Sequence, residues 1–137
     1  MDAIATTGNP SKKAVVAGRI LSVVAILFLI FDSVTHTMLI PAVVEGFAKA
    51  GFPPGAARPI GIIEIICLVL YVIPRTSVLG ALLLTGYLGG AVATNVRMAL
   101  PLFGFVLAPV YIAIVLWLGL WLRDGVLRQV VPLRRAG

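Results

Sequence analysis

The sequence contains few of the residues on which common catalytic and metal-binding motifs depend. Cys67 is the only cysteine, which excludes an intramolecular disulfide, a CxxC redox pair and a cysteine-rich metal site. There is one histidine and the carboxylates are scattered, so no set of metal ligands has a recognisable spacing and we predict no metal site. Redox chemistry would require a cofactor or partner, and the residues do not specify a cofactor.

Charged residues are also scarce. They make up 12% of the chain, against about 25% in soluble domains, while 61% of the residues are hydrophobic. A water-soluble core cannot bury so much apolar surface, and a helix needs roughly 20 apolar residues to cross a bilayer. We therefore predict an all-α fold, an antiparallel bundle of four transmembrane helices. The predicted spans are residues 14–40, 60–73, 78–96 and 102–122.

The connection between the first two spans, residues 41–58, has the pattern of a short helix on the membrane surface. Apolar residues such as Phe47 share one side, and Glu45 and Lys49 stand four residues apart. Gly51 and the prolines after it are placed to end this helix. The domain organisation predicted is an N-terminal tail (1–13), one transmembrane domain (14–122) and a basic C-terminal tail (123–137). The first span is too long for a cleavable signal peptide.

The basic residues are distributed unequally between the two sides of the predicted bundle. Eight lie on the side of the termini and three on the other, so the positive-inside rule predicts that both termini are cytoplasmic. The net charge of +6 reflects this topology, and we expect no nucleic-acid partner. The eight are Lys12, Lys13, Arg19, Arg75, Arg123, Arg128, Arg134 and Arg135, and the three are Lys49, Arg58 and Arg97.

Several polar residues fall inside the predicted spans, where each ionisable group costs about 2.5–3.5 kcal/mol and so requires a partner or a function. The topology puts them in the outer half of the bundle, and Asp32 and His36, four residues apart, share a helix face. We hypothesise that six of them border one polar pocket, in which Glu64 and Asp32 act as proton relay or acid and base while the others bind a ligand. The six are Asp32, His36, Glu64, Tyr87, Asn95 and Arg97.

A structural interpretation of the same residues stays open. Asp32 or Glu64 could pair with Arg97, or remain protonated and hydrogen-bonded, and thereby join helices without further function. Gly86 and Gly90 form a GxxxG motif that predicts close packing of another helix. Proline at position 109 predicts a kink in the last helix and a free backbone carbonyl.

The chain resembles the DoxX-like membrane proteins of the wider DoxX superfamily over residues 18–135. The resemblance includes Arg19 near the start of the first span, and Glu64 matches the family's glutamate. The remaining motifs are FDSVTH (31–36), FAKAGFP (47–53), GIIE (61–64), IPRT (73–76), GALLLTGYLGGAVAT (80–94) and WLRD (121–124). Members of the superfamily often have Lys at the position of His36 and His at the position of Asn95.

The resemblance implies a small four-helix membrane protein, and the founding name comes from a subunit of a thiosulfate:quinone oxidoreductase. We therefore expect a bacterial inner-membrane component of redox or respiratory metabolism that binds a quinone-like or lipid-like molecule in an outer-leaflet pocket. Two alternatives remain: an intramembrane acid–base isomerase or cyclase acting on a hydrophobic substrate, and a membrane anchor for a soluble partner. The expected partners are the bilayer, such a small molecule, and a second copy or a redox-complex protein.

Overall fold

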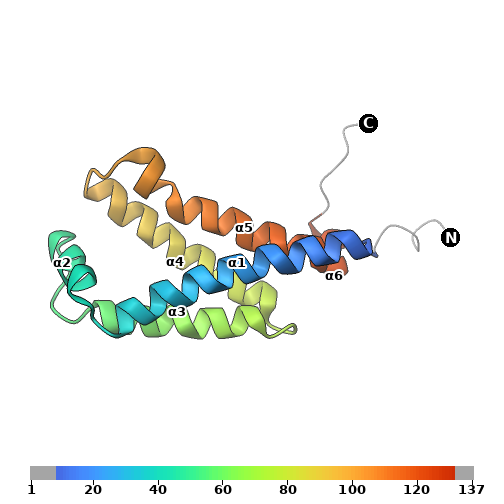
Figure 1. Cartoon of the computed structure of the whole chain (residues 1–137), viewed down its shortest axis with the longest axis horizontal. Helices are drawn as coiled ribbons and strands as arrows, with labels where there is room; N and C mark the ends of the chain where they lie inside the picture. The colour runs from blue at the N-terminus through green and yellow to red at the C-terminus, as the bar shows by residue number, and fades with distance from the viewer. Residues whose placement is uncertain (1–8, 132–137) are drawn as a thin grey trace.

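The computed structural model describes residues 9–131, which are helical and contain no strand (Figure 1). This confirms the all-α class. The elements are α1 (Lys12–Thr37), α2 (Pro41–Lys49), α3 (Ala57–Val72), α4 (Ser77–Arg97), the π-helix η1 (Leu102–Val106), α5 (Ala108–Arg123) and α6 (Gly125–Val130). Residues 1–8 and 132–137 of the two predicted tails, with Arg134 and Arg135, lie outside the described residues.

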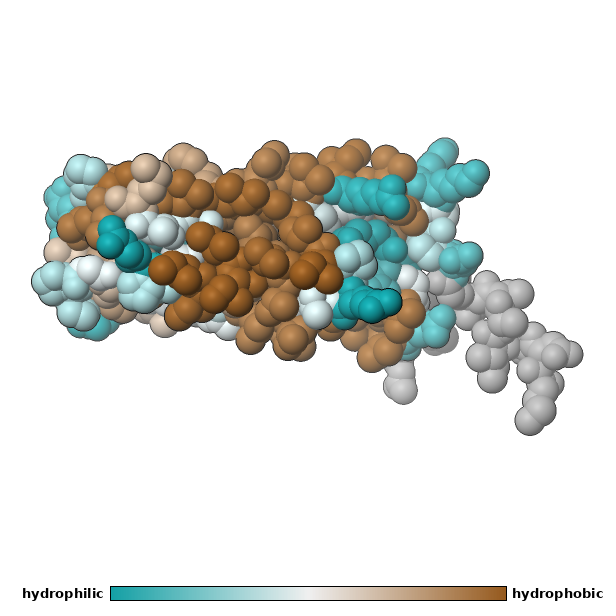
Figure 2. All heavy atoms as spheres, turned by 90° about the horizontal axis from the view of Figure 1, so that it is seen from below, coloured by the Kyte–Doolittle hydropathy of each residue, from teal (hydrophilic) through white to brown (hydrophobic). Residues whose placement is uncertain are grey.

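Three helical segments of the described chain are long and apolar enough to cross a membrane. They are α1, α4, and η1 together with α5, which run continuously over Leu102–Arg123. The second predicted span forms α3, whose 16 residues extend about 24 Å at 1.5 Å per residue. Apolar residues cover the middle of the face seen in Figure 2 and hydrophilic residues gather at its two ends, as in a membrane protein.

The longer helices pack side by side, and α1 and α4 share the same two neighbours. Both pack against α3 and against α5. The start of α1 lies near α6 at one end of the bundle, while α2 and η1 lie at the other end (Figure 1). The two ends are therefore different: one carries the termini of the helical chain, and the other carries the connections that surround the cavity described below.

A buried tyrosine joins three helices near the end that carries α6. Tyr71 of α3 is fully buried, and its hydroxyl donates to the carbonyl oxygen of Leu116 in α5 at 2.8 Å. The same hydroxyl lies 3.0 Å from Oγ of Ser22 in α1. One face of α3 is buried along its length and carries Gly61, Glu64, Leu68 and Tyr71.

The glycines that permit close helix packing are not those of the GxxxG motif. A Cβ built at Gly86 or Gly90 meets no atom of the described chain within 4 Å, so for packing within the chain this prediction is wrong. At Gly18 of α1, by contrast, a Cβ would lie 2.7 Å from the carbonyl oxygen of Gly119 in α5. Gly86 and Gly90 instead leave open space on α4.

The short helix expected between the first two spans forms as α2. Gly51 ends it with φ +78°, a left-handed conformation that glycine adopts without steric cost. Lys49 Nζ lies 2.7 Å from Glu45 Oε1 on the exposed side, as their spacing predicts. The Lys49 ammonium lowers the pKa of Glu45 by hydrogen bonding and by its charge.

The segment after α5 folds back on it. The Asp124 side chain caps α6 by accepting from the backbone N–H of Val126 at 2.9 Å and of Leu127 at 3.0 Å. Arg128 donates to the carbonyl of Trp121 at 2.8 Å, and its guanidinium lies 4.6 Å from the centre of that indole ring. The described part of the predicted basic tail therefore contacts the bundle.

Replacing Tyr71 by Phe removes the hydroxyl that joins α1, α3 and α5. We expect the Tyr71→Phe variant to unfold with a free energy lower by about 0.6–1.7 kcal/mol, the range for hydrogen bonds between membrane helices. Denaturation in mixed detergent micelles measures this. Tyr111→Phe is the matched control, because Tyr111 is exposed; equal stability of the two variants contradicts the assigned role.

Candidate functional site

Asp32 and His36 of α1 and Glu64 of α3 meet inside the bundle, near the end that carries α2. His36 Nδ1 lies 3.5 Å from Asp32 Oδ2, as the four-residue spacing on one helix allows, and 3.7 Å from Glu64 Oε2. A small residue on α3 permits the second approach. A Cβ at Gly61 would lie only 2.8 Å from the Cβ of His36, so no larger residue fits there without displacing α1.

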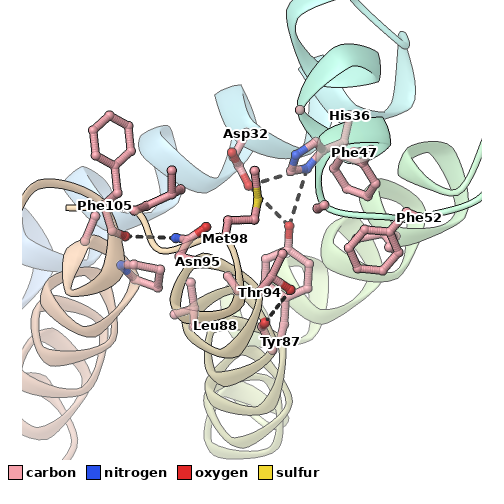
Figure 3. Close-up of a pocket in the computed structure, with 18 of the residues that line it drawn as sticks. Asp32, His36, Phe47, Phe52, Tyr87, Leu88, Thr94, Asn95, Met98 and Phe105 are labelled. Atoms are coloured by element: carbon pink, nitrogen blue, oxygen red, sulfur yellow. Dashed lines mark hydrogen bonds and ion pairs between the residues drawn. The ribbon is translucent and has the colours of Figure 1, made fainter. Parts of the chain in front are cut away.

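Tyr87 of α4 reaches this group from a third helix (Figure 3). Its hydroxyl donates to Asp32 Oδ2 at 3.2 Å and lies 3.4 Å from His36 Nδ1. The four side chains, which we call the polar cluster (Asp32, His36, Glu64 and Tyr87), come from three helices. They connect α1 and α4, which otherwise pack through α3 and α5.

Burial increases through the polar cluster from Asp32 to Glu64. The Asp32 side chain is 35% exposed, that of His36 is 15% exposed and that of Glu64 is fully buried. Neither carboxylate oxygen of Glu64 has a hydrogen-bond partner. In the described part of the chain, no Lys or Arg forms an ion pair with Asp32 or Glu64. The pairing with Arg97 considered above is therefore not formed.

The polar cluster lies beside a cavity of about 600 Å³, which is bordered by α1, α2, the start of α3, α4, η1 and the start of α5. Asp32, His36 and Tyr87 line it, whereas Glu64 lies behind His36. Gly86 and Gly90 contribute space along α4. The rest of the lining is mainly apolar, and its large members are Phe28, Leu29, Phe47, Phe52, Ile60, Leu88, Met98, Leu100 and Phe105.

Asn95 lines the cavity and forms a hydrogen bond beside the proline at the start of α5. Pro109 has no N–H to donate to the carbonyl four residues earlier, that of Phe105. The Asn95 side chain donates to this oxygen instead, at 2.9 Å (Figure 3). The freed carbonyl thus exists as the sequence predicts, although the irregularity is η1, a π-helix before Pro109, and α5 begins only at Ala108.

Arg97 lies outside the cavity lining. It is exposed at the end of α4, and its Nη2 would lie 3.1 Å from a Cβ built at Gly51 in the connection after α2. Of the six residues singled out from the sequence, three therefore line the cavity within the polar cluster, Asn95 lines it further along, Glu64 lies behind it, and Arg97 is apart.

The contribution of α2 to this site was not predicted from the sequence. Phe47 of α2 meets the His36 ring edge to face, with ring centres 5.3 Å apart, and Phe52 lies 5.1 Å from Phe47 (Figure 3). These rings cover one side of the cavity. The apolar side of α2 was the one feature that could have indicated this contact, but the same pattern is equally typical of a helix on the membrane surface.

A family model matches residues 20–119, which include the polar cluster and the whole cavity lining. The chain belongs to the DoxX-like family. Comparison with curated proteins and with solved structures gave no match. This match confirms the resemblance found in the sequence motifs. Family membership and the three long apolar helical segments together identify this DoxX-like protein as a membrane protein.

Replacing Gly61 by Ala in this DoxX-like protein introduces a Cβ where α1 and α3 are closest. We expect Gly61→Ala to lower the free energy of unfolding by about 1–3 kcal/mol, the usual cost of overpacking a core. Gly86→Ala, on α4, is the matched control and should be neutral, since nothing lies within 4 Å of the added atom. Unfolding in mixed micelles compares the two, and a tolerant Gly61 would refute the close approach.

Proposed function

We propose that this DoxX-like protein spans the membrane with four helices and binds a quinone-like or lipid-like molecule in the cavity beside the polar cluster. The observation that carries the proposal is the cavity itself. Its volume of about 600 Å³ falls within the roughly 300–1,000 Å³ of small-molecule sites, which are mostly apolar with a few converging polar groups. The family name adds an association with redox or respiratory metabolism by analogy.

The distribution of side chains suits an amphiphile. A carbonyl or hydroxyl headgroup would lie against Asp32, His36 and Tyr87, whose polar atoms are within 3.2–3.5 Å of one another. An apolar ring or chain would extend past Gly86 and Gly90 toward Phe105, where the cavity has no ionisable side chain. Asn95 then keeps its hydrogen bond to the η1 backbone and shapes this apolar part of the site.

The order of burial also suits proton transfer to a bound headgroup. His36 Nδ1 lies between Asp32 at the cavity and Glu64 in the core, at 3.5 and 3.7 Å. In this role Glu64 would hold or release a proton through His36, and Asp32 or Tyr87 would exchange it with the ligand. Reduction or oxidation of a quinone requires such an exchange.

The topology proposed is that predicted from the charges, with α3 as the shortest of four spans and both termini cytoplasmic in a bacterial inner membrane. Support for α3 as a span comes from its place between α1 and α4, since it packs against both. The bilayer accommodates short spans by local thinning, at fractions of a kcal/mol per Å. The polar cluster and cavity then lie in the outer half of the membrane.

The isomerase or cyclase alternative requires two carboxyl groups at the substrate. Asp32 meets this requirement, but Glu64 is fully buried behind His36 and would act only through that imidazole. The anchor alternative uses the basic tail as a docking surface. Arg128, the tail's basic residue in α6, donates instead to the carbonyls of Trp121 and Leu122. Binding of an amphiphile is therefore the function that the site supports best.

Filling the cavity should displace the bound molecule. Ala91 lines the cavity, so we expect Ala91→Phe to lose an amphiphile that co-purifies with the wild type, as measured by native mass spectrometry. Ala93→Phe, two residues along α4 and exposed, should retain it. Glu64→Gln should alter proton-coupled reduction of a bound quinone analogue while the analogue still binds.

The outcome that contradicts this proposal is equally concrete. A wild-type preparation free of bound amphiphile in mild detergent, or a molecule retained by Ala91→Phe as well as by Ala93→Phe, removes the cavity as the binding site. Both variants must show a cooperative unfolding transition, so that loss of the ligand is not loss of the fold.

The proposed orientation can be tested with single cysteines. In a background with Cys67→Ala, Lys49→Cys should react with a membrane-impermeant maleimide added outside intact spheroplasts, because Lys49 is exposed beyond the outer end of α1. Arg75→Cys, in the exposed turn between α3 and α4, should react only after lysis. The reverse pattern would show that the termini are outside, and labelling of both from outside would show that α3 does not span.

A further inference from the structure

The separations within the polar cluster are unusual for hydrogen bonds. The His36 Nδ1 atom lies 3.5 Å from one carboxylate oxygen and 3.7 Å from the other, beyond the ~2.7–3.2 Å of N–H···O bonds. One ligand atom from each of Asp32, His36 and Glu64 lies within 4.8 Å of the other two. The three groups therefore converge on a common point without bonding firmly to each other.

The local charge is also unbalanced. Two carboxylates and one imidazole share an apolar environment, and no basic side chain of the described residues pairs with them. Glu64 is fully buried, has no hydrogen-bond partner at either oxygen, and directs Oε2 toward His36 Nδ1. A buried carboxylate without a partner is costly, so this arrangement favours a positively charged group at the point where the three side chains converge.

We propose that Asp32, His36 and Glu64 bind a divalent first-row transition-metal ion. The ligand atoms are one carboxylate oxygen of Asp32, Nδ1 of His36 and one carboxylate oxygen of Glu64. Bonds of about 2.0–2.2 Å at tetrahedral angles separate ligand atoms by about 3.3–3.6 Å. The two separations at His36 Nδ1 are close to this value, and the third, between the two carboxylates, is at most 4.8 Å, so the carboxylates would move inward to complete the site. One imidazole with two carboxylates suits Zn²⁺, Fe²⁺ or Mn²⁺.

The surroundings resemble those of a metal site with an open coordination position. The Tyr87 hydroxyl donates to Asp32 Oδ2 and would orient this ligand, as outer hydrogen bonds do in metal sites. Asp32 lines the cavity and is partly exposed, which gives an ion a route in and leaves the fourth position facing a bound molecule. The sequence predicted no metal site because its one histidine and the distant Glu64 have no characteristic spacing.

This inference does not depend on the proposed amphiphile, and in the metal-bound protein the ion would replace the proton that His36 Nδ1 exchanges with the two carboxylates in the metal-free protein. It is tested by titrating untagged, chelator-treated protein in detergent with Zn²⁺ by calorimetry, with no quinone or lipid added. We expect one Zn²⁺ per chain, and binding weaker by at least about 100-fold in Glu64→Gln and His36→Gln. Tyr87→Phe should weaken it by about 10–100-fold, as loss of a hydrogen bond to a ligand does.

Glu45→Gln is the matched control, since it removes one carboxylate from the exposed side of α2 and should leave the affinity unchanged. If Glu64→Gln shows no cooperative unfolding transition, Asp32→Asn replaces it, because Asp32 is partly exposed. Absence of stoichiometric Zn²⁺ binding by the wild type overturns the proposal. So does wild-type affinity in the folded carboxylate variant, even where the amphiphile is found by mass spectrometry.

Discussion

The close approach of α3 to α1 at Gly61 determines which polar groups meet inside this bundle. Glu64 follows Gly61 by one helical turn on the same buried face. The close helix contact that requires glycine at position 61 therefore also brings the Glu64 carboxylate to His36. The glycine and the glutamate therefore belong to one structural feature. Its energetic cost is the burial of an ionisable group, which the apolar packing of the surrounding helices must offset.

A second local constraint acts at the end of the bundle that carries α2, η1 and the cavity. It is the missing N–H of Pro109. The chain forms η1 before α5 begins, and because Pro109 has no N–H, the Phe105 carbonyl is free to accept from the Asn95 side chain. Gly86 and Gly90 keep side chains out of the space beside η1. In this DoxX-like protein small residues thus serve two purposes: some allow helices to touch, and others preserve a cavity between them.

Much of this arrangement follows from periodicity within single helices. The runs of apolar residues predicted the helices, the spacing of Asp32 and His36 predicted their shared face, and Pro109 predicted the free carbonyl. The GxxxG motif failed because a motif of small residues permits either a close helix or an empty space, and only the neighbouring helix decides between them.

The sequence by itself determined that this is a helical membrane protein, that Asp32 and His36 share a helix face, and that the chain belongs with the DoxX-like proteins. The tertiary structure decided that Glu64 faces His36, that Tyr87 crosses to Asp32, and that Arg97 stays outside. The physical reason is that periodicity fixes directions only relative to one helix axis. The rotation and separation of two helices depend on contacts summed along their whole interface, and these contacts come from residues distant in the chain.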